Sequence, residues 1–191
     1  MVLRPRCPGI DRRGAAAYTC AMDEFEKALS PVVQSMRVII GAMCMGLLMM
    51  AGVTVMLSLK AQGKVPPAGD GALPVLSAVH AFMVVSSYAM GWFLTEQQYK
   101  ASRGTTAASA PERIQTAEIM LWATREGPAL LGFVVCFLAG TSGIAARQPL
   151  YWLNASSTLL FWGLALNNFP SEERYREIYR TKLQGGSPSG L

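Results

Sequence analysis

The sequence predicts an all-α integral membrane protein: an up-and-down four-helix bundle with short amphipathic cytoplasmic helices at both ends. Three observations support this class. Hydrophobic residues make up 51% of the 191 positions and charged residues only 15%, whereas soluble domains contain about 25% charged residues. The apolar residues gather in four long runs, and the Lys and Arg residues lie mostly between those runs. Runs of this length leave too little of the chain for a sizeable soluble core.

Each apolar run is long enough, at ~1.5 Å per residue, to cross a hydrocarbon core ~30 Å thick. A soluble bundle of unusually apolar helices is the alternative, but the first run lacks the polar stripe that a water-facing helix needs. We therefore expect one domain over residues 22–183. Its predicted spans are about 38–59, 72–94, 119–146 and 149–169.

The positive charges predict the orientation. Thirteen Lys and Arg residues lie in the N-terminal segment, the middle loop and the C-terminal tail, whereas the other two loops hold only Lys60, Lys64 and Arg147. Lys and Arg are enriched in cytoplasmic loops, so we expect both termini in the cytoplasm and the protein in the cell's inner (plasma) membrane. The charges form no single basic patch, which disfavours nucleic acid as a partner.

The N-terminal flank divides into two parts. Residues 1–21 are rich in Arg, Pro, Gly and Ala and lack hydrophobic periodicity, so we expect disorder there. We take it as a hypothesis that the natural protein starts at Met22. Over residues 23–36, apolar side chains recur every three or four positions, which predicts an amphipathic helix at the membrane surface. Pro31 would mark the bend into the first span.

The C-terminal flank predicts a second amphipathic helix, over residues 171–183. Ser171 has the features of an N-cap and is followed by two acidic residues and an apolar stripe. The basic residues of this helix would hold it against anionic lipid. Residues 184–191 are expected to form a disordered tail.

Glu126 is the candidate ion-binding residue, because an ionisable side chain at membrane depth is costly and often functional. Its depth depends on where the third span lies. Hydropathy favours 127–146, which leaves Arg125 and Glu126 at the headgroups as an interfacial charge pair. The turn formers of 140–143 favour 119–141 instead, which places Glu126 about 10 Å below the cytoplasmic surface. Both placements remain open at this point.

The stretch from Glu126 to Val135 resembles the carboxylate-bearing helix of the ring-forming c subunit of rotary ATP synthases, with an acid followed by small and apolar residues, an aromatic and a Val-rich run. The resemblance covers ten residues and implies that Glu126 carries a translocated H⁺ or Na⁺. Arg125 departs from the family pattern, and the first span has only scattered glycines in place of a dense glycine repeat.

Three further polar residues are candidates inside the predicted spans: His80, Asn154 and Arg125. His80 is the only histidine, and its functional interpretation is a proton relay or a ligand. Its simpler interpretation is a neutral imidazole bonded to a neighbouring helix. Asn154 could join helices by hydrogen bonds, and Arg125 could extend back to the headgroups.

Small residues at helical spacing predict where helices approach closely. The first span is also rich in methionine, but these residues point in several directions around a helix, as packing and lipid-facing residues do. Neither the methionines nor the four cysteines form a pattern that predicts a metal site or a disulfide framework. We expect no metal and no cofactor. The predicted packing residues are Ala42, Gly46, Ser87, Gly91, Gly132 and Gly140.

Three function classes remain. We favour a non-enzymatic accessory or assembly subunit, with the lipid bilayer and other membrane proteins, or a second copy, as partners. An ion-translocating or carrier component that uses Glu126 is the first alternative. A membrane enzyme is the second, disfavoured because the sequence has no paired carboxylates with histidine and no Ser-His-Asp set.

Overall fold

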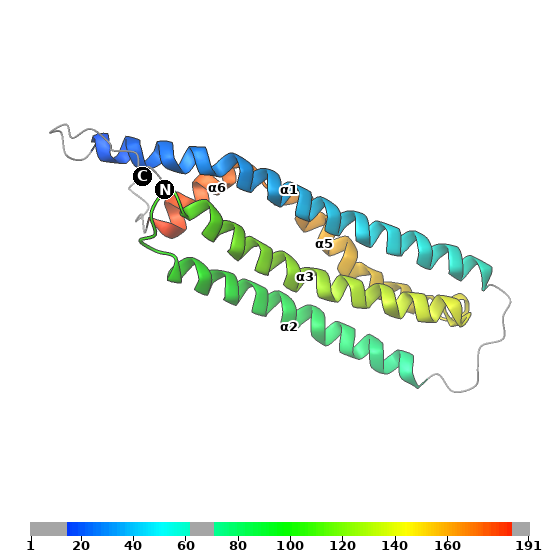
Figure 1. Cartoon of the computed structure of the whole chain (residues 1–191). Helices are drawn as coiled ribbons and strands as arrows, with labels where there is room; N and C mark the ends of the chain where they lie inside the picture. Colours follow the sequence, from blue (N-terminus) through cyan, green and yellow to red (C-terminus); the bar gives the residue numbers. More distant parts are fainter. Residues whose placement is uncertain (1–14, 62–70, 185–191) are drawn as a thin grey trace, which may run out of the picture.

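The computed structural model describes residues 15–61 and 71–184, and within them the chain is helical, without strands. Three long helices, α1 (Ala15–Lys60), α2 (Ala72–Ala101) and α3 (Ala110–Thr141), run side by side (Figure 1). The chain then continues through the short helix α4 (Ile144–Arg147), the 3₁₀ helix η1 (Pro149–Ala155) and α5 (Ser156–Asn167), and returns along the bundle. It ends in α6 (Glu172–Ile178) and the π-helical turn η2 (Tyr179–Leu183).

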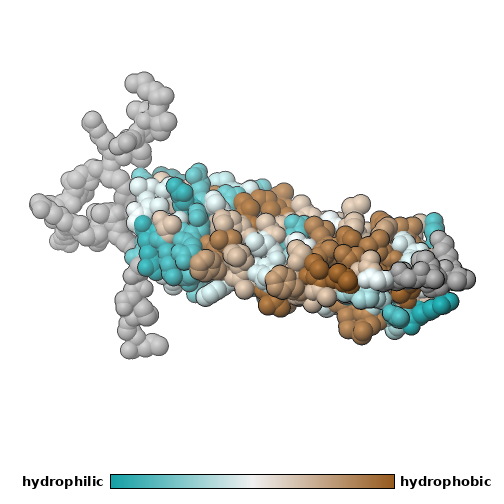
Figure 2. Space-filling view, turned by 90° about the horizontal axis from the view of Figure 1, so that it is seen from below, coloured by the Kyte–Doolittle hydropathy of each residue, from teal (hydrophilic) through white to brown (hydrophobic). Residues whose placement is uncertain are grey.

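The three long helices are each long and apolar enough to cross a membrane, over Met22–Lys60, Ala72–Ala101 and Ala110–Thr141. This indicates a membrane protein. Large apolar side chains stay exposed along the middle of the bundle, as expected for a surface that faces lipid. Figure 2 shows hydrophobic residues over the middle of the molecule and hydrophilic residues concentrated at one end, the end at which α6 lies.

The N-terminal half of α1 differs from the prediction. Residues 23–36 and the first span form a single helix that contains Pro31, rather than a surface helix bent into a span, and this helix begins at Ala15, within the segment expected to be disordered. Proline removes only one backbone hydrogen bond, and packing outweighs that loss, because the apolar stripe shares one buried core with residues of α3, α6 and η2. The stripe comprises Phe25, Leu29, Val32, Val33 and Met36, all buried.

The fourth predicted span also differs. In place of one α-helix over 149–169, the chain forms η1 and then the twelve-residue helix α5. Asn154 gives the physical reason, because its side-chain amide donates to the Tyr151 carbonyl, a local bond that competes with regular helix. At ~2.0 Å per 3₁₀ residue and ~1.5 Å per α residue, the two segments extend about 32 Å in line.

The third long helix ends earlier than the predicted span of 119–146. α3 stops at Thr141, and Gly143 has a positive φ of 75°, a left-handed conformation that favours glycine after a helix. Ala145 and Ala146 belong to α4. Of the two placements of the third span, the helix end agrees with 119–141.

Residues 1–14, 62–70 and 185–191 lie outside the described structure. The predictions for the terminal segments and for the loop between the first two spans therefore stay untested over those ranges.

Candidate functional site

The described part of the chain contains a buried polar cluster that the sequence analysis missed. Glu118, on α3, is only 3% exposed. Arg174 of α6 donates to both of its carboxylate oxygens, at 3.0 and 3.1 Å. Tyr99 donates to Oε1 at 3.1 Å and Trp122 to Oε2 at 3.3 Å. These four hydrogen bonds surround the carboxylate on both oxygens.

A sequence signal for Glu118 did exist. Ile114, Ala117, Leu121 and Trp122 follow a helical stripe, and all four are buried. Glu118 lies on that stripe, one turn after Ile114 and one turn before Trp122, so its side chain shares the buried face. Its partner Arg174 is 56 positions away, and hydrophobic periodicity carries no information about such a contact.

The C-terminal segment closes the same end of the bundle. Tyr175, Tyr179 and Leu183 are buried, and the ring of Tyr179 stacks on Phe25 with centroids 4.4 Å apart. The segment therefore packs on protein, and its apolar stripe is not left for lipid as we expected.

Its basic residues also bind protein. Arg176 donates to both oxygens of Glu26, at 2.6 and 2.8 Å, and Lys182 donates to Glu96 at 2.8 Å. The hydrogen bond with Glu26 is the main cause that raises the pKa of Arg176 above its ordinary value. With the bond from Arg174 to Glu118, these contacts tie α6 and η2 to all three long helices.

His80 lies in a second polar cluster, about 12 Å along α2 from its start at Ala72. Its Nδ1 is 2.9 Å from Asn154 Oδ1, and its Nε2 is 3.0 Å from Ser157 Oγ. The Asn154 amide nitrogen donates to Ser77 at 3.2 Å, which leaves Oδ1 as the acceptor for an Nδ1–H of the imidazole. Both ring nitrogens therefore have partners on η1 and α5.

This cluster fits the simpler interpretation of His80, a histidine bonded to a neighbouring element. It borders a cavity of about 540 Å³ between α2 and η1 that Ser77, His80 and Asn154 line together with apolar side chains. Ser157 and Thr158 lie on the other side, against the carbonyls of Pro128 and Ala129 in α3. The network joins α2, α3 and the η1–α5 segment.

Arg125 lies half-buried on α3. Its guanidinium carbon is 5.3 Å from the ring centre of Trp122 and 5.7 Å from that of Tyr88. Its Nε is buried, and among the described residues it has no hydrogen-bond partner. It forms no ion pair with Glu126, because adjacent residues of a helix point in different directions.

Glu126 is half-buried, so it is a less buried carboxylate than Glu118. It lies toward α1, within electrostatic range of Cys44. Glu126 does not line the cavity beside His80.

Two contacts bracket the level of Glu126 along the bundle. Gln115 of α3 donates to Ser35 of α1 at 3.2 Å, and Gly140 of α3 lies against Ser58 of α1. The two helices run in the same direction (Figure 1), so the positions between these contacts pair in order. Glu126 is then level with the region of Cys44, about 9 Å inside the apolar run of 38–59.

The predicted packing residues fall into two groups. Gly91, Gly132 and Gly140 lie where a Cβ atom would collide with Thr124, with Asn154 and with Ser58, respectively. Ser87 is half-buried. Ala42 and Gly46 are exposed instead, and a Cβ on Gly46 would meet nothing.

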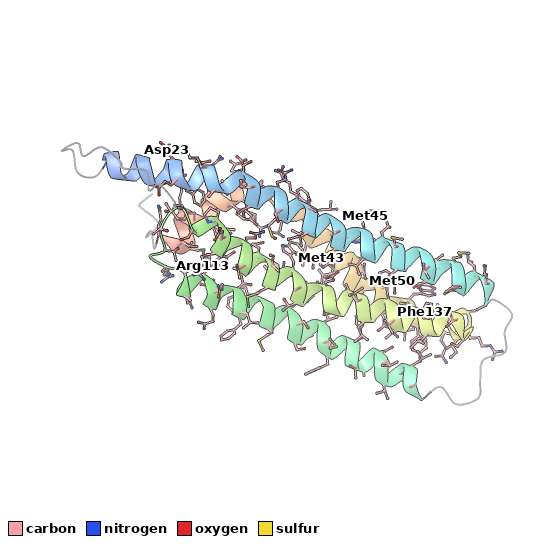
Figure 3. All side chains as sticks on the ribbon, in the orientation of Figure 1. Asp23, Met43, Met45, Met50, Arg113 and Phe137 are labelled. Atoms are coloured by element: carbon pink, nitrogen blue, oxygen red, sulfur yellow. The ribbon has the colours of Figure 1, made fainter. Side chains whose placement is uncertain are left out.

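The methionines of α1 point both ways. Met43 and Met50 pack against the core, whereas Met45 is 57% exposed. Figure 3 shows Met43 and Met50 between α1 and α3, and Met45 on α1 away from α3. They do not converge on one point.

An apolar groove of about 420 Å³ separates α1 from α5. Gly41 lies in it, and a Cβ atom on this glycine would meet nothing within 4 Å. Met45 and Leu166 border the groove from the two helices and are largely exposed. The other lining residues are Ile40, Cys44, Leu48, Trp162, Ala165 and Phe169.

Comparisons with known proteins return no relatives. No protein-family model, no curated protein and no solved structure matches this chain.

Proposed function

We propose that this protein is a multi-pass membrane subunit without enzymatic activity, and that it binds a transmembrane helix of a partner through the groove between α1 and α5. In this proposal η1 and α5 together make the fourth crossing of an up-and-down bundle. Both termini and the loop before α3 face the cytoplasm, and the membrane is the cell's inner membrane. The positive charges of those segments support this orientation.

The groove with Gly41 in it is the observation that carries the proposal. Helices associate in lipid chiefly through close packing at small residues, because lipid tails are as apolar as leucine side chains. The bundle uses Gly91, Gly132 and Gly140 for its own contacts. Gly41 stays available to a helix from outside.

The two buried polar clusters also support a partner-binding role for the outer face of the bundle. Glu118 is surrounded by donors, and both ring nitrogens of His80 have partners. Groups held in this way join helices to one another. The structural role of these clusters leaves the outer face of the bundle as the surface for a partner.

A photoreactive amino acid at Met45, with the tagged full-length chain expressed in its native host, tests the proposal. We expect one discrete cross-linked product from Met45 and none from Val85, an even more exposed position on α2. A product of twice the chain mass identifies a second copy as the partner. Cross-links to lipid alone would overturn the proposal.

A pair of glycine variants supplies the matched control. Gly41→Leu fills the groove and should abolish both the cross-link and co-purification in mild detergent. Gly163→Leu adds the same side chain at an equally open position on α5 that does not line the groove, and should leave both unchanged. A partner retained by Gly41→Leu would contradict this assignment.

A second candidate function is ion translocation through Glu126, which the resemblance to the rotary c subunit implies. The level of Glu126 along the bundle, within the apolar run of α1, favours it. Glu126→Gln should then abolish ion flux in proteoliposomes and the labelling of this carboxylate by carboxyl-modifying reagents. Unchanged flux in the variant would remove this candidate.

A further inference from the structure

A second groove, of about 330 Å³, lies between α2, α3 and the C-terminal α6–η2 segment. Three cations and three carboxylates line it. Two of the cations are already paired: Arg174 with Glu118, at 3.0 Å, and Lys182 with Glu96, at 2.8 Å. The remaining carboxylate, Glu177, is exposed to solvent.

Arg125 is the cation that stays without an acid partner among the described residues. The buried acid in the same groove, Glu118, already accepts hydrogen bonds from Tyr99, Trp122 and Arg174. Arg125 and Arg174 together therefore place two positive charges beside one buried negative charge.

Aromatic contacts alone do not balance this charge. The faces of Trp122 and Tyr88 supply cation–π attraction to Arg125. This attraction is weaker than the cost of removing an ion from water. Arg125, without an acid partner among the described residues in a groove whose other two cations already bind carboxylates, suits an anion.

We propose that this groove binds a phosphate group through Arg125. The guanidinium presents a planar fork of donors that matches the oxygens of phosphate. The groove extends from Arg125, which lies at the level of the apolar run in α1, to Lys182 near the hydrophilic end of the bundle. Trp92 borders it and is 68% exposed, a position typical of tryptophan at a membrane interface.

The phosphate has two possible sources: the headgroup of a cytoplasmic-leaflet lipid and free phosphate in solution. The melting temperature of the full-length protein in detergent, titrated with each of three additives, distinguishes them. The additives are phosphatidylglycerol, diacylglycerol with the same acyl chains and inorganic phosphate. We expect a saturable rise with phosphatidylglycerol and none with diacylglycerol, which lacks the phosphate. A rise with inorganic phosphate alone assigns the site to the free ion.

Arg125→Leu should weaken the response to the phosphate compound at least tenfold. Arg113→Leu is the matched control, because Arg113 is an exposed arginine at the start of the same helix, away from the groove (Figure 3). Arg125→Lys keeps the charge but lacks the planar fork of donors. This variant should still fold, and it should bind the phosphate compound several-fold more weakly than the wild type does. No response to any phosphate compound, or equal responses from Arg125→Leu and the wild type, would overturn the proposal.

Discussion

The bond between Arg174 and Glu118 provides the sharpest test of how the C-terminal segment is held. Arg174→Met removes the guanidinium while keeping an unbranched side chain that can still pack. Glu118 would then remain buried, with only Tyr99 and Trp122 as donors. The variant should therefore be less stable, and α6 should detach more readily from the bundle.

The stability that Arg174→Met should lose lies between two limits. Removing one partner of a fully buried ion pair costs about 3–5 kcal/mol, whereas exposed pairs contribute about 1 kcal/mol or less. The Glu118 side chain is 4% exposed and that of Arg174 is 24% exposed. Because one partner is partly solvated and two donors remain, we expect a loss of about 2–3 kcal/mol. Adding Glu118→Gln to Arg174→Met should recover part of that loss, because no buried charge then remains unpaired.

Unfolding by sodium dodecyl sulfate in mixed micelles, followed by tryptophan fluorescence, measures the free energies. Arg180→Met is the matched control in the same segment, because Arg180 is exposed and forms no hydrogen bond or ion pair within the described residues; its cost should stay within about 0.5 kcal/mol. The reasoning fails if Arg174→Met costs no more than Arg180→Met, or if the double variant is no more stable than Arg174→Met alone.

Two further predictions concern packing. Gly132→Ala should destabilise the protein by about 1–3 kcal/mol, because the added Cβ would overpack the contact between α3 and η1. Gly163→Ala is the control: its Cβ would lie in open space, so its effect on stability should be neutral or slightly stabilising. Equal effects of the two substitutions would contradict the close approach of α3 to η1 at Gly132. Phe25→Ala should lower the stability of the protein by about 3–5 kcal/mol, because Phe25 is fully buried against Tyr179. Hydrogen exchange over residues 171–183 should also become faster. Exchange as slow as in the wild type would contradict the packing of the C-terminal segment on Phe25.

Local sequence patterns are enough to predict some of the helices. The apolar runs predict α1, α2 and α3, because membrane-length hydrophobicity is a property of contiguous residues. The end of α3 could also be read locally, from the glycines at 140 and 143. Two details differ from the predictions: the run of 149–169 begins as a 3₁₀ helix, and α1 continues through Pro31 as one helix. Contacts hold both, because Asn154 bonds within η1 and across to α2, and the stripe around Phe25 packs on Tyr179.

The pairing of charged residues in the candidate site could not be predicted from local patterns. By itself, the sequence determined the class of the protein, its all-helical character and three helices that can cross a membrane, since each depends on composition and spacing within one segment. It singled out Glu126 as the candidate ion-binding carboxylate and left its depth open. Only the tertiary structure showed that Glu118 is more deeply buried than Glu126, and that Arg125 has no acid partner among the described residues. Pairing between residues tens of positions apart depends on how the helices pack, and no local pattern carries that information.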